Sequence, residues 1–447
     1  MSFSRYPAYK DSGVEWLGEV PVHWEVVRLN TIATCNDEVL LESTPEDYEI
    51  EYVEISGVQA GQGIVETAAL PFGNSPSRAR RVVRDGDVLI STVRTYLRAI
   101  AQVKNPPENM IASTGFAVLR PRRIDSGFLG YACHAEGFVS EVIARSVGVS
   151  YPAINASELA RLPLPLPTSP EQTAIANFID HETAKIDALV AEQERLIELL
   201  KEKRQAVISH AVTKGLDPSV PMKDSGVEWL GEVPAHWEVM PLKRDIEFVT
   251  SGARGWAENY AEDGDLFIRI GNLTRDTIRL DLSDVQRVTV PDSAEVARTE
   301  VQSGDVLFSI TAYLGSVAVV PPDLGRAFVS QHVALARPRG HRLQPEWIAY
   351  VTASHVGKTC LEMLGYGGTK VQLSLGDVAN LLVTVPALHE QEDLVHFLDR
   401  EIAYFDALTA EAQRAIGLLQ ERRTALITAA VTGQIDVRGF VPPRAGV

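Results

Sequence analysis

The chain has little cysteine, no long apolar run and no overall excess of positive charge. Its three cysteines, Cys35, Cys133 and Cys360, are too few and too scattered for a disulfide framework or a zinc cluster. No apolar run approaches the roughly 18 residues that span a bilayer. The first residues also lack the apolar segment of a secretion signal. We therefore expect a soluble, cytoplasmic protein without a metal site.

Charge is unevenly distributed along the chain. The formal net charge of -17 argues against a general polyanion-binding protein. Every charged residue between Asp37 and Glu66 is acidic, whereas basic residues prevail from Arg78 to Arg123, with a milder basic excess at 326–370. Local basic regions on an acidic chain favour a nucleic-acid-binding face, but ordinary solvated surface explains them equally well.

An internal repeat is the most informative feature. The phrase KDSGVEWLGEVPVHWEV at residues 10–26 returns at residues 223–239 with one change, from Val22 to Ala235. Later matches link RDGDVLIS to QSGDVLFS, STGFAVLRP to SQHVALARP, and FIDHETAKIDALVAEQERL to FLDREIAYFDALTAEAQRA. The segments between these matches differ. The chain is therefore predicted to be two copies of one unit that recognise two different things.

The repeat divides the chain into two similar sets of segments and a tail. Short apolar, β-branched stretches such as DVLIS and FAVLRP predict strands, and GFLGYACHAEGFVSEVIARS predicts helix, so each variable domain should be mixed α/β. The predicted segments are an N-terminal segment (1–29), a first variable domain (30–167), a long helix (168–215), a linker with the second repeated phrase (216–242), a second variable domain (243–386), a second long helix (387–433) and a C-terminal tail (434–447).

The two long helices carry apolar residues at heptad spacing, which predicts a seam between them. If they pack antiparallel, one register brings Glu182 to Arg422 and Lys203 to Glu401. The alternative is that each helix lies separately on its own domain. We favour the antiparallel pair because a twofold duplication closes most simply that way. The candidate seam residues are Ile179, Ile186, Leu189, Leu196, Leu200, Val207, Leu398, Phe405, Leu408, Leu419 and Leu426.

Short matches to catalytic motifs fail on their neighbours. NPP at residues 105–107 is similar to the Asn-Pro-Pro-aromatic motif of amino-methyltransferases, but Glu108 replaces the aromatic residue and no glycine-rich loop precedes it. GKT at residues 357–359 lacks the upstream glycine of a phosphate-binding loop. His23 and His236 lie beside tryptophans, so packing explains them better than catalysis. We therefore predict a non-catalytic chain with no cofactor of its own.

Taken together, these segments resemble the specificity subunit of type I restriction–modification systems. The resemblance rests on the doubled phrase GVEWLGEVPVHWEV, on GDVLIS followed by LRP, on PLPTSPEQTAIANFID leading into a long helix and on its counterpart VPALHEQEDLVHFLD. It covers nearly the whole chain. It implies two mixed α/β target-recognition domains in a pseudo-twofold arrangement, separated by an antiparallel pair of long α-helices.

The same resemblance implies a function. Each target-recognition domain would read one half of a split, asymmetric sequence in double-stranded DNA, and the helix pair would fix the spacing of the halves. Two modification subunits would bring S-adenosylmethionine and methylate adenine. Restriction subunits, which translocate and cut DNA, could join them. The chain lacks the tandem short repeats that some relatives carry between the domains, so the spacing stays open.

Candidate DNA contacts are polar, basic and aromatic residues of the variable domains. Arginine pairs with guanine edges and glutamine with adenine edges, and glycines let the backbone approach phosphate. For each residue alone, ordinary surface or framework is at least as good an interpretation. The candidates are Arg78, Arg80, Arg94, Tyr96, Arg98 and Tyr151 in the first domain, and Arg254, Tyr313, Tyr366, Lys370 and Gln372 in the second.

The tryptophans of the repeated phrase are assigned to packing, not to base stacking. Each phrase is predicted to lie where a long helix meets a variable domain, so two equivalent junctions need two phrases. Replacing Trp16 or Trp229 should then lower stability rather than change the DNA sequence that is read. The other two phrase tryptophans are Trp24 and Trp237.

Other functional classes remain open at this point. A free-standing bipartite DNA-binding protein without restriction partners would bind its site tightly on its own. A fused enzyme with hidden methyltransferase activity would transfer a methyl group from S-adenosylmethionine without help. A purely structural scaffold is disfavoured, because the divergence is confined to the variable domains.

Overall fold

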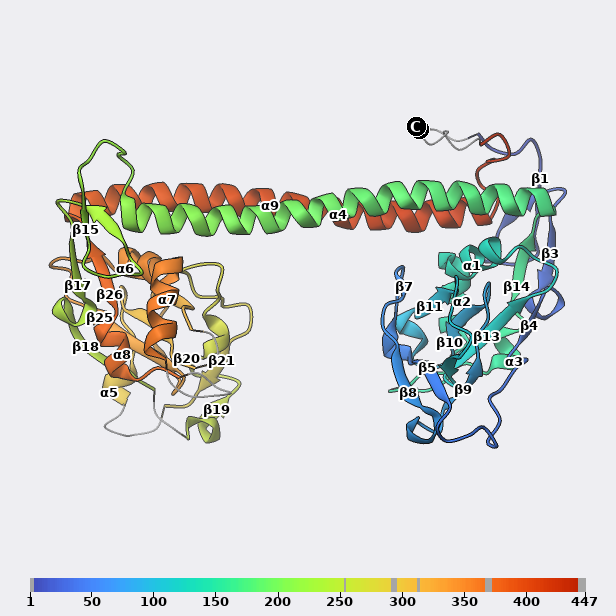
Figure 1. Cartoon of the computed structure of the whole chain (residues 1–447), viewed down its shortest axis with the longest axis horizontal. Coiled ribbons are helices and arrows are strands. Elements are labelled where there is room, and N and C mark those ends of the chain that lie inside the picture. Colours follow the sequence, from blue (N-terminus) through green and yellow to red (C-terminus); the bar gives the residue numbers. More distant parts are fainter. Residues whose placement is uncertain (1–3, 253–254, 291–295, 312–313, 366–371, 441–447) are drawn as a thin grey trace. The chain divides into compact units, whose positions relative to one another are not determined.

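The computed structural model describes residues 4–252, 255–290, 296–311, 314–365 and 372–440 (Figure 1). Contacts divide the chain into two compact units. Unit 1 contains Met1–Gln193 and Gln413–Val447, and unit 2 contains Glu194–Ala412. Both units combine sheets with helices, so the predicted mixed α/β class is confirmed.

Unit 1 has two four-stranded sheets and several short two-stranded sheets. The first sheet has the order β11-β10-β13-β4, and the second has the order β8-β5-β12-β9 with β12 parallel to β5. The strands of the first sheet are β4 (Ala33–Cys35), β10 (Val88–Ser91), β11 (Ile100–Gln102) and β13 (Phe116–Pro121). Those of the second are β5 (Glu49–Val53), β8 (Ala68–Pro71), β9 (Ala79–Val82) and β12 (Met110–Ser113). The paired short strands are β1 (Tyr9–Asp11) with β2 (Glu19–Pro21), β3 (Glu25–Arg28) with β14 (Pro163–Leu166), and β6 (Val58–Gln59) with β7 (Gly63–Ile64). The helices are α1 (Ser126–His134), α2 (Glu136–Ala144) and α3 (Ala156–Leu159).

Unit 2 repeats this plan, with the sheet orders β18-β25-β22-β23 and β19-β21-β20-β24. The first sheet contains β18 (Ile246–Ser251), β22 (Val306–Ser309), β23 (Val317–Val319) and β25 (Val333–Pro338). The second contains β19 (Tyr260–Ala261), β20 (Asp265–Ile268), β21 (Gln286–Val288) and β24 (Ala327–Val329). The paired short strands are β15 (Met222–Asp224) with β16 (Glu232–Pro234), and β17 (Glu238–Pro241) with β26 (Leu382–Val385). The helices are α5 (Val296–Thr299), α6 (Pro345–Ala353), α7 (His355–Leu364) and α8 (Leu375–Asn380).

The repeated GDVL phrases form strands that are buried on both faces. Successive side chains of a strand point to opposite faces, and here both faces meet an apolar core. In β10, Val88 and Ile90 belong to one core and Leu89 belongs to another. In β22, Val306 and Leu307 are divided between two cores in the same way. This explains why the phrase is apolar without polar alternation.

Two long helices complete the units (Figure 1). α4 (Ser169–Lys214) begins in unit 1 and ends in unit 2, whereas α9 (Leu388–Val431) begins in unit 2 and ends in unit 1. Within each unit the two helices run antiparallel (Figure 1), and an ion pair links them: Asp187–Arg423 at 2.5 Å in unit 1 and Arg204–Asp406 at 2.9 Å in unit 2. The antiparallel interpretation is therefore confirmed. In the part of the chain that the structure describes, no helix combines the length and apolarity needed to cross a membrane.

One half of the predicted seam is wrong by one residue. Leu189 and Leu196 are 45% and 41% exposed, whereas Ile197 is buried. On α4 the second row of seam residues, next to the row of Ile179 and Ile186, contains Thr183, Ile197 and Arg204. Because two of these side chains are polar, a search for apolar heptad positions does not detect this row. The other predicted seam residues are confirmed, since Ile179, Ile186, Leu200, Leu398 and Phe405 are buried and Val207, Leu408, Leu419 and Leu426 are partly buried.

The predicted ion pairs across the seam are wrong for the same reason. Glu182 pairs with Lys185 on its own helix at 2.5 Å, and Glu401 pairs with Arg400. The observed pairs, given above, use the arginines one residue beyond Lys203 and Arg422. Both observed pairs fit one register, because the step from Asp187 to Arg204 along α4 equals the step from Arg423 back to Asp406 along α9.

In unit 1 the repeated phrase contacts both long helices at their ends. His23 Nε2 lies 2.8 Å from the Glu171 carboxylate in the first turn of α4. Gly433, just after α9, has a positive φ of 73°, and a Cβ there would lie 3.1 Å from the buried Trp24 ring. Glycine fits this helix-terminating position because it adopts the left-handed conformation freely.

In unit 2 the second copy of the phrase repeats the histidine and glycine contacts with the helices exchanged. His236 lies 3.0 Å from Glu390 in the first turn of α9, and Trp237 Nε1 donates to Glu390 at 2.9 Å. Gly215, which follows α4 with φ of 73°, faces the Trp237 ring. Each phrase thus joins the start of one long helix to the end of the other, and the packing assignment of Trp24 and Trp237 is confirmed.

The shifted seam can be tested with neighbouring residues. Ile197→Ala should lower the free energy of unfolding by about 2 kcal/mol, because it removes buried methyl groups. Leu196→Ala should lower it by less than about 0.5 kcal/mol, because that side chain is largely exposed. Urea unfolding followed by circular dichroism measures both. Equal losses, or a larger loss for Leu196→Ala, would contradict the observed seam.

The outer tryptophans of the repeated phrase give a second stability test. Trp16 is half-buried, covers Gly137 and packs edge-on against Phe138 at 6.4 Å, and Trp229 packs on the core of unit 2. Trp16→Ala and Trp229→Ala should each lower stability by about 2 kcal/mol, less than a fully buried tryptophan. Thermal unfolding checks this, with Trp16→Phe as the milder control. An unchanged midpoint for both alanine variants would refute the packing role.

Candidate nucleic-acid interface

Two loops that are distant in sequence meet at one edge of unit 1. Loop A is residues 92–98, after β10, and loop B is residues 146–153. The Arg94 N–H donates to the Pro152 carbonyl at 2.7 Å, and the Ile154 N–H donates to the Thr92 carbonyl at 2.9 Å. Val93 and Ala153 also form a β-bridge. The two loops therefore form one continuous surface.

Loops A and B present the residues that suit nucleic acid. The Arg94 guanidinium lies over the Tyr151 ring at 4.6 Å. Tyr96 and Tyr151 are 51% and 60% exposed, and Val149 projects fully into solvent. Arg94 and Arg98 adopt positive φ angles of 52° and 54°, which are uncommon for residues other than glycine and often mark functional loops. The structure thus brings Arg94, Tyr96 and Tyr151 together.

The other arginine candidates of unit 1 are held by protein groups. Arg98 makes a two-pronged ion pair with Glu136 at 2.6 and 2.7 Å, which ties loop A to α2. Arg78 is paired with Glu54 and donates to the Tyr52 hydroxyl at 3.2 Å. Arg80 lies over the Phe72 ring at 4.8 Å. Their part in DNA binding stays a prediction.

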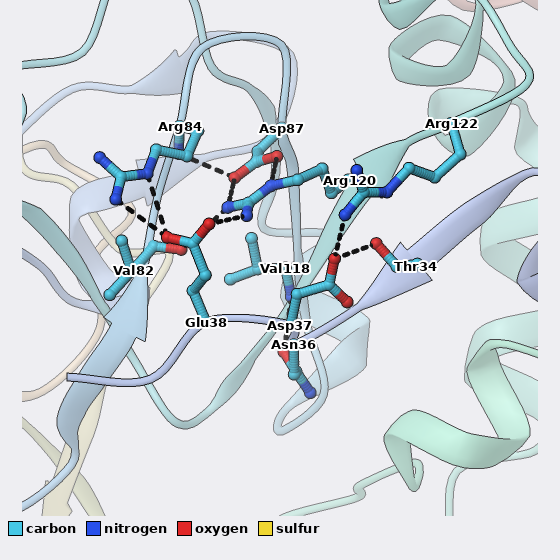
Figure 2. A network of polar contacts seen from close by, with 10 residues as sticks. All are labelled: Thr34, Asn36, Asp37, Glu38, Val82, Arg84, Asp87, Val118, Arg120 and Arg122. Atoms are coloured by element: carbon cyan, nitrogen blue, oxygen red, sulfur yellow. Dashed lines mark hydrogen bonds and ion pairs between the residues drawn. The ribbon is translucent and has the colours of Figure 1, made fainter. Parts of the chain in front are cut away.

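The acidic run and the basic run of unit 1 pair with each other. Arg84 and Arg120 both contact Glu38, at 2.9 and 2.6 Å, and Arg122 contacts Asp37 at 2.8 Å (Figure 2). Hydrogen bonds from Arg84 hold the pKa of Glu38 below its usual value. These arginines therefore have acidic partners within the fold, and their part in DNA binding stays a prediction.

At the centre of this network is a fully buried carboxylate. Asp87 accepts two parallel hydrogen bonds from the Arg120 guanidinium, both at 2.9 Å, and a third from the backbone N–H of Arg84 at 2.8 Å (Figure 2). The Asp87 carboxylate raises the pKa of Arg120. Asp305 and Arg337 form the same two-pronged pair in unit 2, at 2.8 Å for both bonds.

This ion pair explains why an aspartate and an arginine recur together in both repeats, a pattern that the search for motifs did not use. The aspartate of each GDVL phrase and the arginine of the following RP phrase recur together in both repeats. They recur because they contact each other across two neighbouring strands, β10 with β13 and β22 with β25. Paired recurrence of opposite charges in a doubled sequence could therefore have predicted the contact.

Unit 2 builds the corresponding edge with the same backbone contacts. The Leu373 N–H donates to the Ile310 carbonyl at 3.0 Å, and the Ile310 N–H donates to the His332 carbonyl at 3.1 Å. Gln372 forms a bridge with Thr311, just as Ala153 does with Val93 in unit 1. The sequence candidate Gln372 thus lies on this edge. Arg254, Tyr313, Tyr366 and Lys370 lie outside the described residues.

The edge of unit 2 is hollowed by a cavity of about 570 Å³. Besides the exposed Gln372, its lining includes Gln331 and His332, whose side chains lie 3.1 Å apart. Sequence reasoning missed these two residues, although SQHVALARP differs from STGFAVLRP at these positions. Amide and imidazole groups at such an edge can donate to and accept from base edges.

The two fragments that are similar to catalytic motifs, NPP and GKT, have structural positions in the fold. Asn105, in the NPP fragment, occupies a turn with φ of 51° and donates its N–H to Asp85 at 2.6 Å. The GKT fragment lies inside α7. Among the described ranges, no cluster of three or more histidine, cysteine or acidic side chains has the placement of a metal site.

The family model described as "Type I restriction modification DNA specificity domain" matches residues 21–199 and 234–416. The type I restriction enzyme EcoKI specificity subunit of Escherichia coli K12 is 22% identical over 94% of this chain and 91% of its own length. The putative MjaX specificity subunit of Methanocaldococcus jannaschii is 22% identical over 94% and 96%.

Another similar protein is matched over a shorter span. The EcoBI specificity subunit of Escherichia coli is 23% identical over 68% of this chain, and the match spans 64% of that subunit. A solved chain from a study of assembly and conformational transition of the type I R-M system has a TM-score of 0.71 at 22% identity, covering 92% of this chain and 98% of that chain. The HsdS subunit of Thermoanaerobacter tengcongensis has a TM-score of 0.51 at 22% identity, covering 93% and 98%.

The buried ion pair of unit 1 predicts that substitutions of two neighbouring arginines, Arg120 and Arg122, have different effects on stability. Arg120→Met should lower the free energy of unfolding by about 3 kcal/mol, because it leaves the buried Asp87 without its counter-charge. Arg122→Met should cost less than about 1 kcal/mol, because its side chain is 56% exposed. Chemical unfolding of both variants is the measurement. A cost for Arg120→Met as small as that for Arg122→Met would refute the assigned framework role.

Proposed function

The chain belongs to the type I restriction–modification DNA specificity family, and from this premise we propose that each unit reads one half of a split DNA target through its loop edge. The family match carries this conclusion, since it covers both repeats, at residues 21–199 and 234–416. A DNA-specificity role with two recognition regions also fits the doubled fold, in which the framework recurs and the loops differ.

The two edges carry different chemistry, which suits an asymmetric target. Unit 1 offers Arg94 with Tyr96 and Tyr151, whereas unit 2 offers Gln331 and Gln372. Arginine makes two-pronged hydrogen bonds to guanine, and glutamine does so to adenine. We propose that the half read by unit 1 contains a guanine contacted by Arg94, and that the half read by unit 2 contains an adenine contacted by Gln372.

We propose that the chemistry is supplied by partners. Two modification subunits would bring S-adenosylmethionine and methylate adenine, and restriction subunits could join to cut unmodified DNA. The chain itself would be non-catalytic and would act in the cytoplasm. The proposal is supported by the relatives, which are specificity subunits of type I restriction enzymes. We also propose that the lengths of α4 and α9 set the number of bases between the two halves.

The direct experiment maps methylated adenines. The chain is expressed with its genomic modification subunit in a host without adenine methylation, and the DNA is read by long-read sequencing. A split motif that needs both proteins supports the proposal. Methylation by the chain alone would indicate a fused methyltransferase. Tight binding of a specific site with no methylation in any partner combination would favour the free-standing DNA-binding protein.

Loops A and B give a quantitative prediction. Arg94→Ala and Tyr151→Ala should each weaken binding of the mapped target by about 5- to 150-fold, which corresponds to 1–3 kcal/mol per base contact. Arg161→Ala and Tyr48→Ala are matched controls, because both residues are exposed and lie outside loops A and B. Fluorescence anisotropy with target and unrelated duplexes measures the affinities.

The same titrations can contradict the proposed base contacts of loops A and B. If Arg94→Ala weakens target and unrelated DNA equally, the residue contacts phosphate instead of a base. If both loop variants bind the target as tightly as the controls, loops A and B are not the reading surface of unit 1.

A further inference from the structure

Unit 2 contains a second hollow, separate from its loop edge. This cavity, of about 300 Å³, lies between α4, α9, the α6–α7 junction and the segment 275–279. It shares no lining residue with the loop-edge cavity described above. Its lining holds three aspartates and five basic residues, which are Lys201, Arg204, Arg275, Arg279 and Lys358.

Part of this charge belongs to the framework that both units share. Arg204 pairs with Asp406 at 2.9 Å, and unit 1 has the equivalent pair Arg423–Asp187. The Tyr350 hydroxyl donates to Asp399, and the Tyr131 hydroxyl of unit 1 donates to Asp180 at 2.6 Å. Two of the three aspartates are therefore engaged by groups that have counterparts in unit 1.

Of the remaining basic groups, Lys201 pairs with Glu198 on its own helix at 2.9 Å, and the other three have no charged counterpart among the described residues of unit 1. The α2 and α7 helices correspond, because the N–H of Glu136 and that of His355 each donate to a hydroxyl on a long helix, at 3.1 and 2.9 Å. In that register Lys358 stands where unit 1 has Val139. The segment with Arg275 and Arg279 replaces the β6–β7 hairpin, which carries no charge between residues 58 and 64.

The segment that carries these arginines is anchored at both ends. The buried Asn272 side chain donates to the carbonyls of Asp281 and Asp284 at 2.8 and 2.9 Å. Ile278 is buried in the main core of unit 2, and its carbonyl accepts the Val319 N–H at 2.9 Å. Arg204 also donates to the Asp276 carbonyl. Such anchoring presents a preorganised surface to a ligand.

Lys358 is held where its positive charge is disfavoured. It is half-buried, and its Nζ lies 3.0 Å from the Gln205 side-chain oxygen. Burial, and secondly the charge of Arg275, lower the pKa of Lys358. Gly315, with φ of 84°, leaves room for the stem of this lysine, because a Cβ there would lie 2.6 Å from Lys358 Cγ. An anion in the cavity would offset this crowding of positive charge.

We propose that this cavity binds a phosphodiester group of the DNA backbone, outside the bases that unit 2 reads. The inference rests on the proposed function, which supplies DNA as the anion. Arginine and lysine together are the usual ligands of phosphate oxygens. Because phosphate contacts position a protein without reading sequence, the cavity would fix the register of unit 2 on the duplex. At the matching described positions unit 1 has Val139 and an uncharged hairpin, so we expect the contact to be one-sided.

The test compares the variant Arg279→Gln/Lys358→Gln with wild type and with Lys203→Gln, a control on the exposed side of α4. The full chain is titrated with its mapped target at several salt concentrations. We expect the double variant to lower the slope of log affinity against log salt by about 1, as the loss of one phosphate contact predicts. The ratio of specific to non-specific affinity should stay unchanged.

A second arm uses duplexes that carry one uncharged methylphosphonate linkage at successive backbone positions. At one position outside the half-site, the linkage should weaken wild type and Lys203→Gln but leave the double variant unaffected. If no position behaves so, or if the salt slopes are equal, the proposal is wrong. If inorganic phosphate or a mononucleotide alone raises the melting temperature of wild type but not of the double variant, and the methylphosphonate scan is flat, the cavity takes a free phosphate and the DNA assignment is overturned.

Failure of the proposed function gives a different result. In that case wild type itself shows no preference for any mapped target, whereas a failed cavity proposal leaves the target affinity of all three proteins intact and equal.

Discussion

A buried ion pair sets the register on which each recognition fold depends. Asp87 immediately precedes β10, and Arg120 lies near the end of β13, so their contact fixes one end of this strand pair. Ser91 and Phe116 pair at the other end, where the chain enters loop A. A slip of one residue would reverse every side chain of a strand between the two cores. The ion pair excludes that slip.

Such a pair is better understood as a specificity device than as a source of stability. Burying two charges costs free energy that their attraction only partly offsets, but removing one partner is strongly destabilising. The Asp305–Arg337 pair repeats the arrangement in unit 2 with nearly the same distances. With the strands fixed in this way, the loops at the opposite end can change without disturbing the core. This accounts for a doubled framework with divergent loops.

The sequence predicted the features that are repeated and local. The doubled phrases located the strands, the long helices and the packing tryptophans, because the same physical contacts recur in both units. It failed where a polar residue occupies a buried position: Thr183 and Arg204 lie in the second row of seam residues, and exposed leucines beside them misled the pattern. The basic run from Arg78 to Arg123 looked free because its acidic partners are far away in sequence.

The candidate interface was predictable only in part for a similar reason. Arg94, Tyr96 and Tyr151 have the right chemistry, but their proximity depends on backbone bonds between two loops separated by the whole α1–α2 region. Gln331 and His332 differ from their counterparts in the first repeat, yet only the fold places them beside Gln372. One-dimensional patterns identify residue types, whereas the surface that they form is a property of the folded chain.

We infer that in each unit a fixed framework carries an exchangeable reading surface. The most direct measurement exchanges residues 30–160 for the matching segment of a relative with a different target and then maps methylated adenines in a host that supplies the modification subunit. We expect one half of the split motif to change while the other half and the spacing persist. A folded chimera that retains the original first half, or changes both halves together, would contradict it.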